Sequence, residues 1–214
     1  TALITASDDI KINGVSLGTT STDSAKDKAT AINAISASTN VTATASSKQV
    51  ITLTGTYTGT DDATINGKTV DLTSDKMLDD TVTSINTAMV AAGLDIVASG
   101  DSDGNLVLTS LSGANIITND GATGGLFGTV VDGQGTTITA ASNEFITRGK
   151  LTLTSTDGSI IKLTDGNAAN SGLAKLGLTE QSEFSSASET GLSVSSVANA
   201  SASLTSIDNA ITTV

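Results

Sequence analysis

Two kinds of acidic stretch hold carboxylates at spacings that could support chemistry. Residues 101–105 read Asp-Ser-Asp-Gly-Asn and have the alternating oxygen side chains of a calcium-binding loop, but the closing glutamate of such a loop is missing. Asp-Gly also favours a tight turn, and we predict a turn here. The pairs Asp61-Asp62 and Asp79-Asp80 could serve as acid and base. Both flank predicted elements, and the second pair suits the first turn of a helix, where negative charge is favourable. We interpret these carboxylates as structural.

Hydroxyl groups offer two further kinds of chemistry. Ser159 and Lys162 match a Ser-x-x-Lys motif, which needs a helix to bring the two side chains together. Residues 160–163 follow a strand pattern, in which positions three apart face opposite sides, so we interpret the match as coincidence. The many serine and threonine side chains also offer acceptors for O-linked glycans. Both residue types are common in strands and turns, so the sequence selects no glycosylation site.

The composition excludes most enzyme chemistry. The 214 residues include no histidine, cysteine, proline or tryptophan. A Ser-His-Asp or Cys-His nucleophile, a disulfide, and an imidazole or thiolate metal site therefore cannot form. Ten basic and 22 acidic residues give a net charge of −12, which opposes binding to nucleic acid and to anionic membranes. We expect no enzyme activity and no cofactor, and no stretch is apolar for long enough to span a membrane.

A repeat organises the first half of the chain. The tripeptide Ile-Asn-Gly at residues 12–14 recurs at residues 65–67, which is 53 positions later. The pair Ile-Asn at residues 32–33 recurs at residues 85–86, with the same spacing. Matches that keep one register over about 30 residues predict a duplicated supersecondary unit.

Each copy predicts the same order of elements. Asn-Gly between alternating apolar positions is typical of a β-hairpin with a type I′ turn. Polar residues 19–24 can cap a helix, and apolar residues at helical spacing predict helices near residues 25–36 and 78–89. Two further strands are predicted in each copy, at residues 41–45 and 50–54 and at residues 94–98 and 106–108. The predicted fold class is α+β, predominantly β, with two repeated strand-strand-helix-strand-strand units, a β-hairpin region and a C-terminal helix.

The second half is expected to continue as β structure. Glycine-rich residues 112–145 are interpreted as a loop with short strands at 126–131 and 136–140. A hairpin is predicted between residues 151–154 and 160–163, turning at Asp157-Gly158. The predicted division is a first unit at residues 1–56, a second unit at 57–120, a glycine-rich β region with a returning hairpin at 121–190, and the start of a helix at 191–214.

The final segment changes to a heptad spacing. Its apolar stripe consists of Val197, Ala200, Leu204, Ile207, Ile211 and Val214. One interpretation is a helix that packs on its own domain. The other is the first turns of a long coiled-coil-like helix that continues past this sequence. The stripe contains no glycine or proline stop signal, which favours the second interpretation.

Taken in order, these motifs resemble those of bacterial flagellin. Residues 10–45 and 65–98 are similar to the flagellin IN motif, which is named for its Ile-Asn pairs. Residues 150–158 resemble the hairpin near the end of the flagellin variable region, and residues 176–178 resemble its usual sequel. Residues 191–214 are similar to the start of the flagellin C-terminal helix. The resemblance covers most of the chain.

The resemblance implies a structural role in motility. It implies the surface-exposed outer domain of a flagellin subunit, secreted and extracellular on the bacterial flagellum, and trimmed of the conserved helices that polymerise. The implied partners are other flagellin subunits, through regions mostly outside this sequence, and O-linked glycans. Two alternatives stay open. One is a flagellar cap or hook–filament junction protein, which also carries IN motifs, and the other is a cell-surface adhesin or sugar-binding module.

Overall fold

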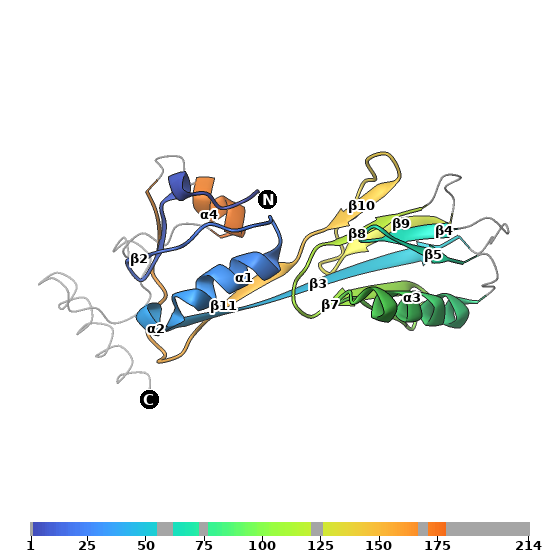
Figure 1. Cartoon of the computed structure of the whole chain (residues 1–214), viewed down its shortest axis with the longest axis horizontal. Helices are drawn as coiled ribbons and strands as arrows, with labels where there is room; N and C mark the ends of the chain where they lie inside the picture. The colour runs from blue at the N-terminus through green and yellow to red at the C-terminus, as the bar shows by residue number, and fades with distance from the viewer. Residues whose placement is uncertain (1, 55–61, 73–76, 121–125, 167–170, 179–214) are drawn as a thin grey trace, which may run out of the picture.

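The computed structural model describes residues 2–54, 62–72, 77–120, 126–166 and 171–178. Its fold is mixed α+β with more strand than helix, as the sequence predicted, and every pairing between the described strands is antiparallel. Two lobes lie side by side, and one long strand, β3 (Val41–Leu53), runs through both of them (Figure 1). We call the lobes the terminal unit (residues 2–46 and 150–178) and the inserted unit (residues 47–147).

The terminal unit combines the two ends of the described chain. A short 3-10 turn, η1 (Ala6–Asp8), precedes a hairpin of β1 (Ile10–Ile12) and β2 (Val15–Ser16). The helices α1 (Ala25–Ala34) and α2 (Ser36–Thr39) and the first half of β3 follow. After the inserted unit, the chain returns with β11 (Lys150–Ser155), β12 (Leu163–Asp165) and α4 (Ser171–Leu176). β11 pairs with β3 and β12 pairs with β1.

The inserted unit repeats this plan in one continuous stretch. Its elements are β4 (Asp62–Ile65), β5 (Lys68–Asp71), α3 (Leu78–Ala92), β6 (Val97–Gly100), β7 (Leu106–Ser110) and β8 (Ile116–Asn119). β8 pairs with β4 as β12 pairs with β1, and β7 pairs with β6 as β11 pairs with the first half of β3. Two more strands, β9 (Phe127–Asp132) and β10 (Glu144–Thr147), pair with β3 and β8 and complete the unit.

The predicted hairpins and helices of the duplication are confirmed. Asn13 and Gly14 have φ angles of 49° and 81°, and Asn66 and Gly67 have 48° and 78°, as a type I′ turn requires. The helices α1 and α3 start at the predicted residues, 25 and 78. Ser24 caps α1, because its hydroxyl oxygen accepts a hydrogen bond from the third helical N–H at 3.2 Å.

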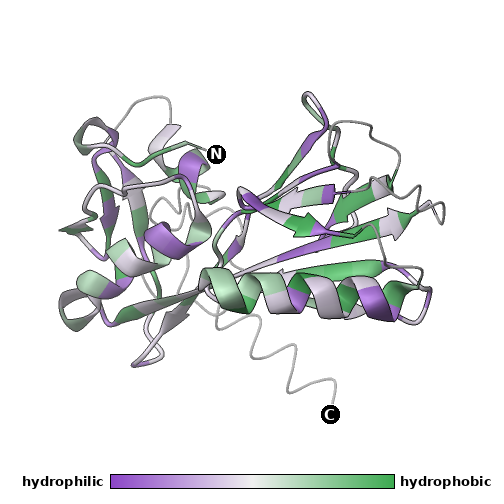
Figure 2. Cartoon of the chain, turned by 45° about the vertical axis from the view of Figure 1, so that its right-hand side comes forward, coloured by the Kyte–Doolittle hydropathy of each residue, from purple (hydrophilic) through white to green (hydrophobic). Residues whose placement is uncertain are grey.

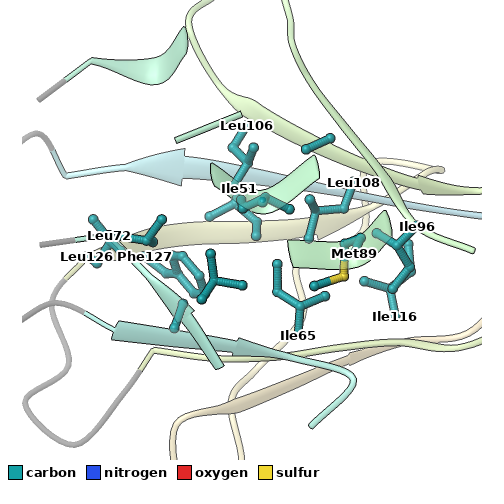
Figure 3. Packing of buried hydrophobic residues seen from close by; sticks show 14 of the residues in the cluster. Ile51, Ile65, Leu72, Met89, Ile96, Leu106, Leu108, Ile116, Leu126 and Phe127 are labelled. Carbon is teal, nitrogen blue, oxygen red and sulfur yellow. The ribbon is translucent and has the colours of Figure 1, made fainter. Parts of the chain in front are cut away.

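Each unit has a hydrophobic core of its own. The inserted unit buries fifteen aliphatic and aromatic residues between α3 and its two sheets, and Figure 3 shows Met89 of α3 among Ile65, Ile96 and Leu108. Figure 2 shows apolar residues concentrated on the strands that α3 covers. The core of the terminal unit consists of Ile4, Ile10, Ile12, Ala29, Ile32, Val41, Ala43, Leu163, Leu173 and Leu176. In sequence, the core of the inserted unit therefore lies between the two halves of the terminal core, rather than following it at the predicted boundary near residue 56.

Three strand predictions are wrong. Residues 41–45 and 50–54 do not form two strands, because β3 is continuous from Val41 to Leu53. The hairpin around Asp157-Gly158 does not form either: its first strand pairs with β3, and the second begins only at Leu163 and pairs with β1. Residues 136–140 form only an isolated bridge, and β8 and the first two residues of β10 lie within residues 112–145, for which the prediction is a loop with other strands. The predicted C-terminal helix lies outside the described residues.

Candidate functional site

The asparagine of each Ile-Asn-Gly turn attaches the hairpin to a third strand. The backbone N–H of Asn13 donates to the carbonyl of Lys162 at 2.8 Å, and the N–H of Lys162 donates to Asn13 Oδ1 at 2.7 Å. Asn66 makes the same two bonds with Ile117, at 2.8 and 2.7 Å. In both turns the side-chain oxygen of the asparagine is the acceptor for a backbone N–H of the third chain segment. The Ile-Asn-Gly sequence therefore specifies a three-stranded sheet as well as a hairpin.

The asparagine of each helical Ile-Asn pair closes the free edge of the neighbouring strand. Asn33 on α1 donates from Nδ2 to the carbonyl of Ala43 at 2.9 Å and accepts from the N–H of Ala43 at 2.7 Å. Asn86 on α3 binds Ala98 in the same way, at 2.9 and 2.8 Å. The opposite edges of these strands pair with β11 and β7. The side-chain amide thus replaces the next strand of the sheet and holds the helix in register.

Replacing Asn33 by alanine is expected to destabilise the terminal unit by about 2–4 kcal/mol. The change removes two hydrogen bonds and leaves the N–H and carbonyl of Ala43, which is 5 % exposed, without partners. Urea unfolding followed by circular dichroism measures this loss. The control is Thr30→Ala on the exposed side of the same helix, which is expected to stay within about 0.5 kcal/mol of the parent protein. Equal losses in both variants would contradict the role of the asparagine.

A second repeat, which the sequence analysis missed, joins the returning strands of both units. Residues 106–121 and 151–166 share Leu-x-Leu-Thr-Ser, a glycine and a final Asp-Gly in one register, 45 positions apart. The two segments have equivalent partners in the structure. Leu108 lies opposite Ala98, which binds Asn86, and Leu153 lies opposite Ala43, which binds Asn33. The sequence carried this signal, but it stands at a different spacing from the 53-residue repeat.

The repeated Asp-Gly motif anchors the segment that follows it. Both carboxylate oxygens of Asp120 accept from the N–H of Leu126, at 3.2 and 3.1 Å. Asp165 accepts from the N–H groups of Gly172 and Leu173, at 2.7 and 3.0 Å. Leu126 and Leu173 are 3 % and 0 % exposed. In both units the aspartate therefore positions a leucine that closes the core.

The two units meet at a compact polar junction. Asp23, just before α1, accepts from Asn115 Nδ2 at 2.8 Å and from Arg148 Nε at 3.0 Å. Gly149 has no room for a side chain: a Cβ there would lie 2.6 Å from Ser47 Oγ and 2.9 Å from both Ala25 Cβ and the carbonyl oxygen of Gly113. Together with the shared strand β3, these contacts fix the orientation of the units.

A part-buried ion pair connects η1, near the start of the chain, to α4. Lys175 Nζ lies 2.8 Å from the carboxylate of Asp8, whose side chain is 5 % exposed. The hydrogen bond from Lys175, supported by the N–H of Thr5, lowers the pKa of Asp8 below its ordinary value of 3.8. The charged carboxylate is thereby favoured in the folded state, whereas burial alone would disfavour it.

This ion pair predicts a loss of stability in acid. Because the folded-state pKa of Asp8 is lower than the unfolded one, the stabilisation is complete above pH 3.8 and is lost as the pH falls through the folded-state value. A double-mutant cycle with Asp8→Asn and Lys175→Met is expected to give a coupling energy of about 1–3 kcal/mol at neutral pH, and less as the acid range is entered. Urea unfolding of the four proteins at each pH measures the coupling. A coupling energy that stays constant with pH would contradict the prediction.

The residues singled out from the sequence do not converge on a catalytic site. Residues 101–105 form the predicted turn: Asp101 accepts from the side-chain amide of Asn105 and from the backbone N–H groups of Asn105 and Asp103, which lowers the pKa of Asp101. Asp79 and Asp80 lie in the first turn of α3, as predicted. Asp62 begins β4, while Asp61 lies outside the described residues.

The remaining predicted residues divide in the same way. Ser159 bonds to Asp157, whereas Lys162 pairs through its backbone with Asn13, so the Ser-x-x-Lys residues serve separate contacts. The heptad stripe Val197, Ala200, Leu204, Ile207, Ile211 and Val214 lies outside the described residues. Within the described ranges, no group of three or more acidic side chains is placed to hold a metal ion, and no helix is long and apolar enough to cross a membrane.

Comparison with known proteins assigns no family to this arrangement. No family model matches the chain, and no curated protein matches it.

Proposed function

We propose that this chain is the surface-exposed outer domain of a flagellin subunit of the bacterial flagellar filament. Its role is structural: it projects from the extracellular filament, takes part in motility through the filament, and has neither enzyme activity nor a cofactor. The observation that supports this most is the use of the repeated Ile-Asn pairs. Asn33 and Asn86 bind equivalent strands, and Asn13 and Asn66 bind equivalent third strands. The residues that carry the resemblance to flagellin are thus the residues that hold each unit together.

The junction between the units suits a domain that bears hydrodynamic load. The thirteen residues of β3 cross from one unit into the other without a break. Asp23 adds hydrogen bonds to Asn115 and Arg148 across the same boundary. On this proposal, the partners are other flagellin subunits, which the chain meets through residues 191–214 and through regions outside this sequence, and O-linked glycans on its hydroxyl-rich surface.

Immunogold electron microscopy tests the proposal in the bacterium that encodes the chain. An antibody raised against the purified protein is expected to label flagellar filaments along their whole length. Label confined to the filament tip would instead indicate a cap protein, and label confined to the filament base would indicate a hook–filament junction protein. Label on the cell body would indicate an adhesin. A strain that lacks the gene controls for the specificity of the antibody.

A further inference from the structure

A cationic pocket lies beside the junction of this strongly acidic chain. The pocket has a volume of about 290 Å³ and is lined by Ser46, Lys48, Gly133, Gln134, Arg148 and Lys150. It thus gathers two of the lysines and the single arginine of a sequence whose net charge is −12. Clustering of positive charge against the overall charge of the chain indicates a local role for these side chains.

Strand geometry places the two lysines on one face. Ser46 and Lys48 are two positions apart on β3, so their side chains point to the same side of the sheet. Lys150 lies directly opposite Ser46 on β11 and shares that side. The residues on either side of Lys48, Ser47 and Gln49, are 2 % and 0 % exposed and face inward. The buried positions therefore determine that both lysines point outward into the pocket.

The arginine and the pocket wall are held in place independently of any ligand. Asp23 binds Arg148 through Nε at 3.0 Å, which orients the guanidinium. The next residue, Gly149, packs so closely into the junction that no side chain fits there. On the opposite wall, the backbone of Gly133 rests on Lys48, where a Cβ would lie 3.1 Å from Lys48 Cβ.

The carboxylates near the pocket are already engaged by other groups. Asp23 accepts from Asn115 as well as from Arg148. Asp132 Oδ1 accepts from the N–H groups of Gln134 and Thr136, at 2.9 and 2.8 Å, and so shapes the turn that forms the wall. Asp101, which lies within electrostatic range of Lys48, is held by its own turn. Among the residues that the structure describes, these two lysines and the arginine therefore outnumber the one carboxylate, that of Asp23, that forms an ion pair with them.

We propose that this pocket binds an oxyanion group, a carboxylate or a phosphate, carried by a molecule no larger than a monosaccharide. The volume of about 290 Å³ lies just below the range of about 300–1,000 Å³ that is typical of ligand pockets, so the ligand must be small. Arginine and lysine bind both oxyanions through charge-assisted hydrogen bonds. Ser46 and Gln134 supply neutral hydrogen-bonding groups for hydroxyls next to the charged group. The inference does not depend on the flagellar role.

Titration of the intact, isotopically labelled protein tests the pocket by NMR at physiological ionic strength. The probes are glucuronate for the carboxylate, glucose 6-phosphate for the phosphate, and glucose as the neutral control. Saturable shifts are expected at the amides of Ser46, Lys48, Gln134 and Lys150 with one or both anionic sugars, and no shifts are expected with glucose. Binding of only one anionic sugar identifies the oxyanion, and binding of both shows that the pocket accepts either a carboxylate or a phosphate.

Two double variants separate a specific site from general attraction to positive charge. Lys48→Gln with Lys150→Gln removes two exposed pocket lysines and is expected to weaken binding about tenfold or more. Lys68→Gln with Lys162→Gln changes the net charge equally at exposed positions outside the pocket and is expected to leave the affinity within about twofold. The proposal is overturned if neither anionic sugar gives saturable shifts in the pocket, if glucose shifts the same amides equally, or if the two double variants weaken binding to the same extent.

Discussion

Alanine at Gly113 is expected to destabilise the protein by about 2–4 kcal/mol. Gly113 has φ +77°, which costs an alanine about 1 kcal/mol. Its new Cβ would also overlap the Cβ of Ala45 and lie 2.9 Å from the carbonyl carbon of Ala45. Overpacking of this kind adds about 1–3 kcal/mol or more. The obstructing atoms belong to β3, which both units share, so the strain cannot be confined to a flexible side chain.

The duplication supplies a matched control for this substitution. Gly158 is the counterpart of Gly113 in the second repeat and has φ +76°, but nothing lies within 4 Å of the position that its Cβ would occupy. Gly158→Ala is therefore expected to cost only the backbone term, about 1 kcal/mol. Thermal unfolding is expected to show melting temperatures lowered by roughly 4–16 °C for Gly113→Ala and by roughly 2–4 °C for Gly158→Ala. Equal shifts would show that the junction is more plastic than its contacts indicate.

The local elements could be predicted from the sequence because their signals are local. Asn-Gly specifies the two hairpins through the positive φ angles of its residues. An apolar stripe after a capping serine specifies α1. The Asp-Gly turn at residues 101–105 is also formed by its own side chains. In each case the partners of the hydrogen bonds lie within a few residues.

The long strand was missed because two of its inward positions are polar. Ser47 and Gln49 interrupt the alternation of buried apolar residues along β3, which makes one strand resemble two. In the structure, Ser47 donates to the carbonyl of Ala114, and Gln49 bonds to Thr118 and Thr147, all far along the chain. A buried amide that is satisfied by distant hydroxyls is compatible with a strand. The sequence cannot show those partners before the topology is known.

The cationic pocket could not be predicted for the same reason. Lys48 and Lys150 are about a hundred positions apart in the sequence and meet only because β11 returns to β3 rather than to the segment that follows it. The hairpin predicted at Asp157-Gly158 followed from the preference of neighbouring strands to pair. That preference fails here because β11 pairs with an edge of β3 instead. This pairing matches that of β7 with β6 in the inserted unit.

The nesting of one unit within the other predicts that the terminal unit folds without the inserted one. Every residue of its core lies before residue 47 or after residue 149. Ala45 lies opposite Leu151 in the terminal unit, as Gly100 lies opposite Leu106 in the inserted unit, where residues 101–105 close the hairpin. A chain in which residues 101–105 join Ala45 directly to Leu151 is therefore expected to form the same β-pairing with a native turn.

The expected result is a monomer that melts cooperatively and gives a dispersed NMR spectrum. The deletion exposes the N–H of Lys26 and the carboxylate of Asp23, which water can bind in place of the junction. It also replaces a connection of about a hundred residues by a five-residue turn, which lowers the entropic cost of closing the strand pair. A second chimera retains Ser46, so that the same five-residue turn places Ser46, instead of Ala45, opposite Leu151. The pairing of β3 with β11 then shifts by one residue, and the buried side chains of β3 turn outward. The first chimera is expected to be the more stable by several degrees in melting temperature, and a non-cooperative melt of the first chimera would show that the terminal core depends on the inserted unit.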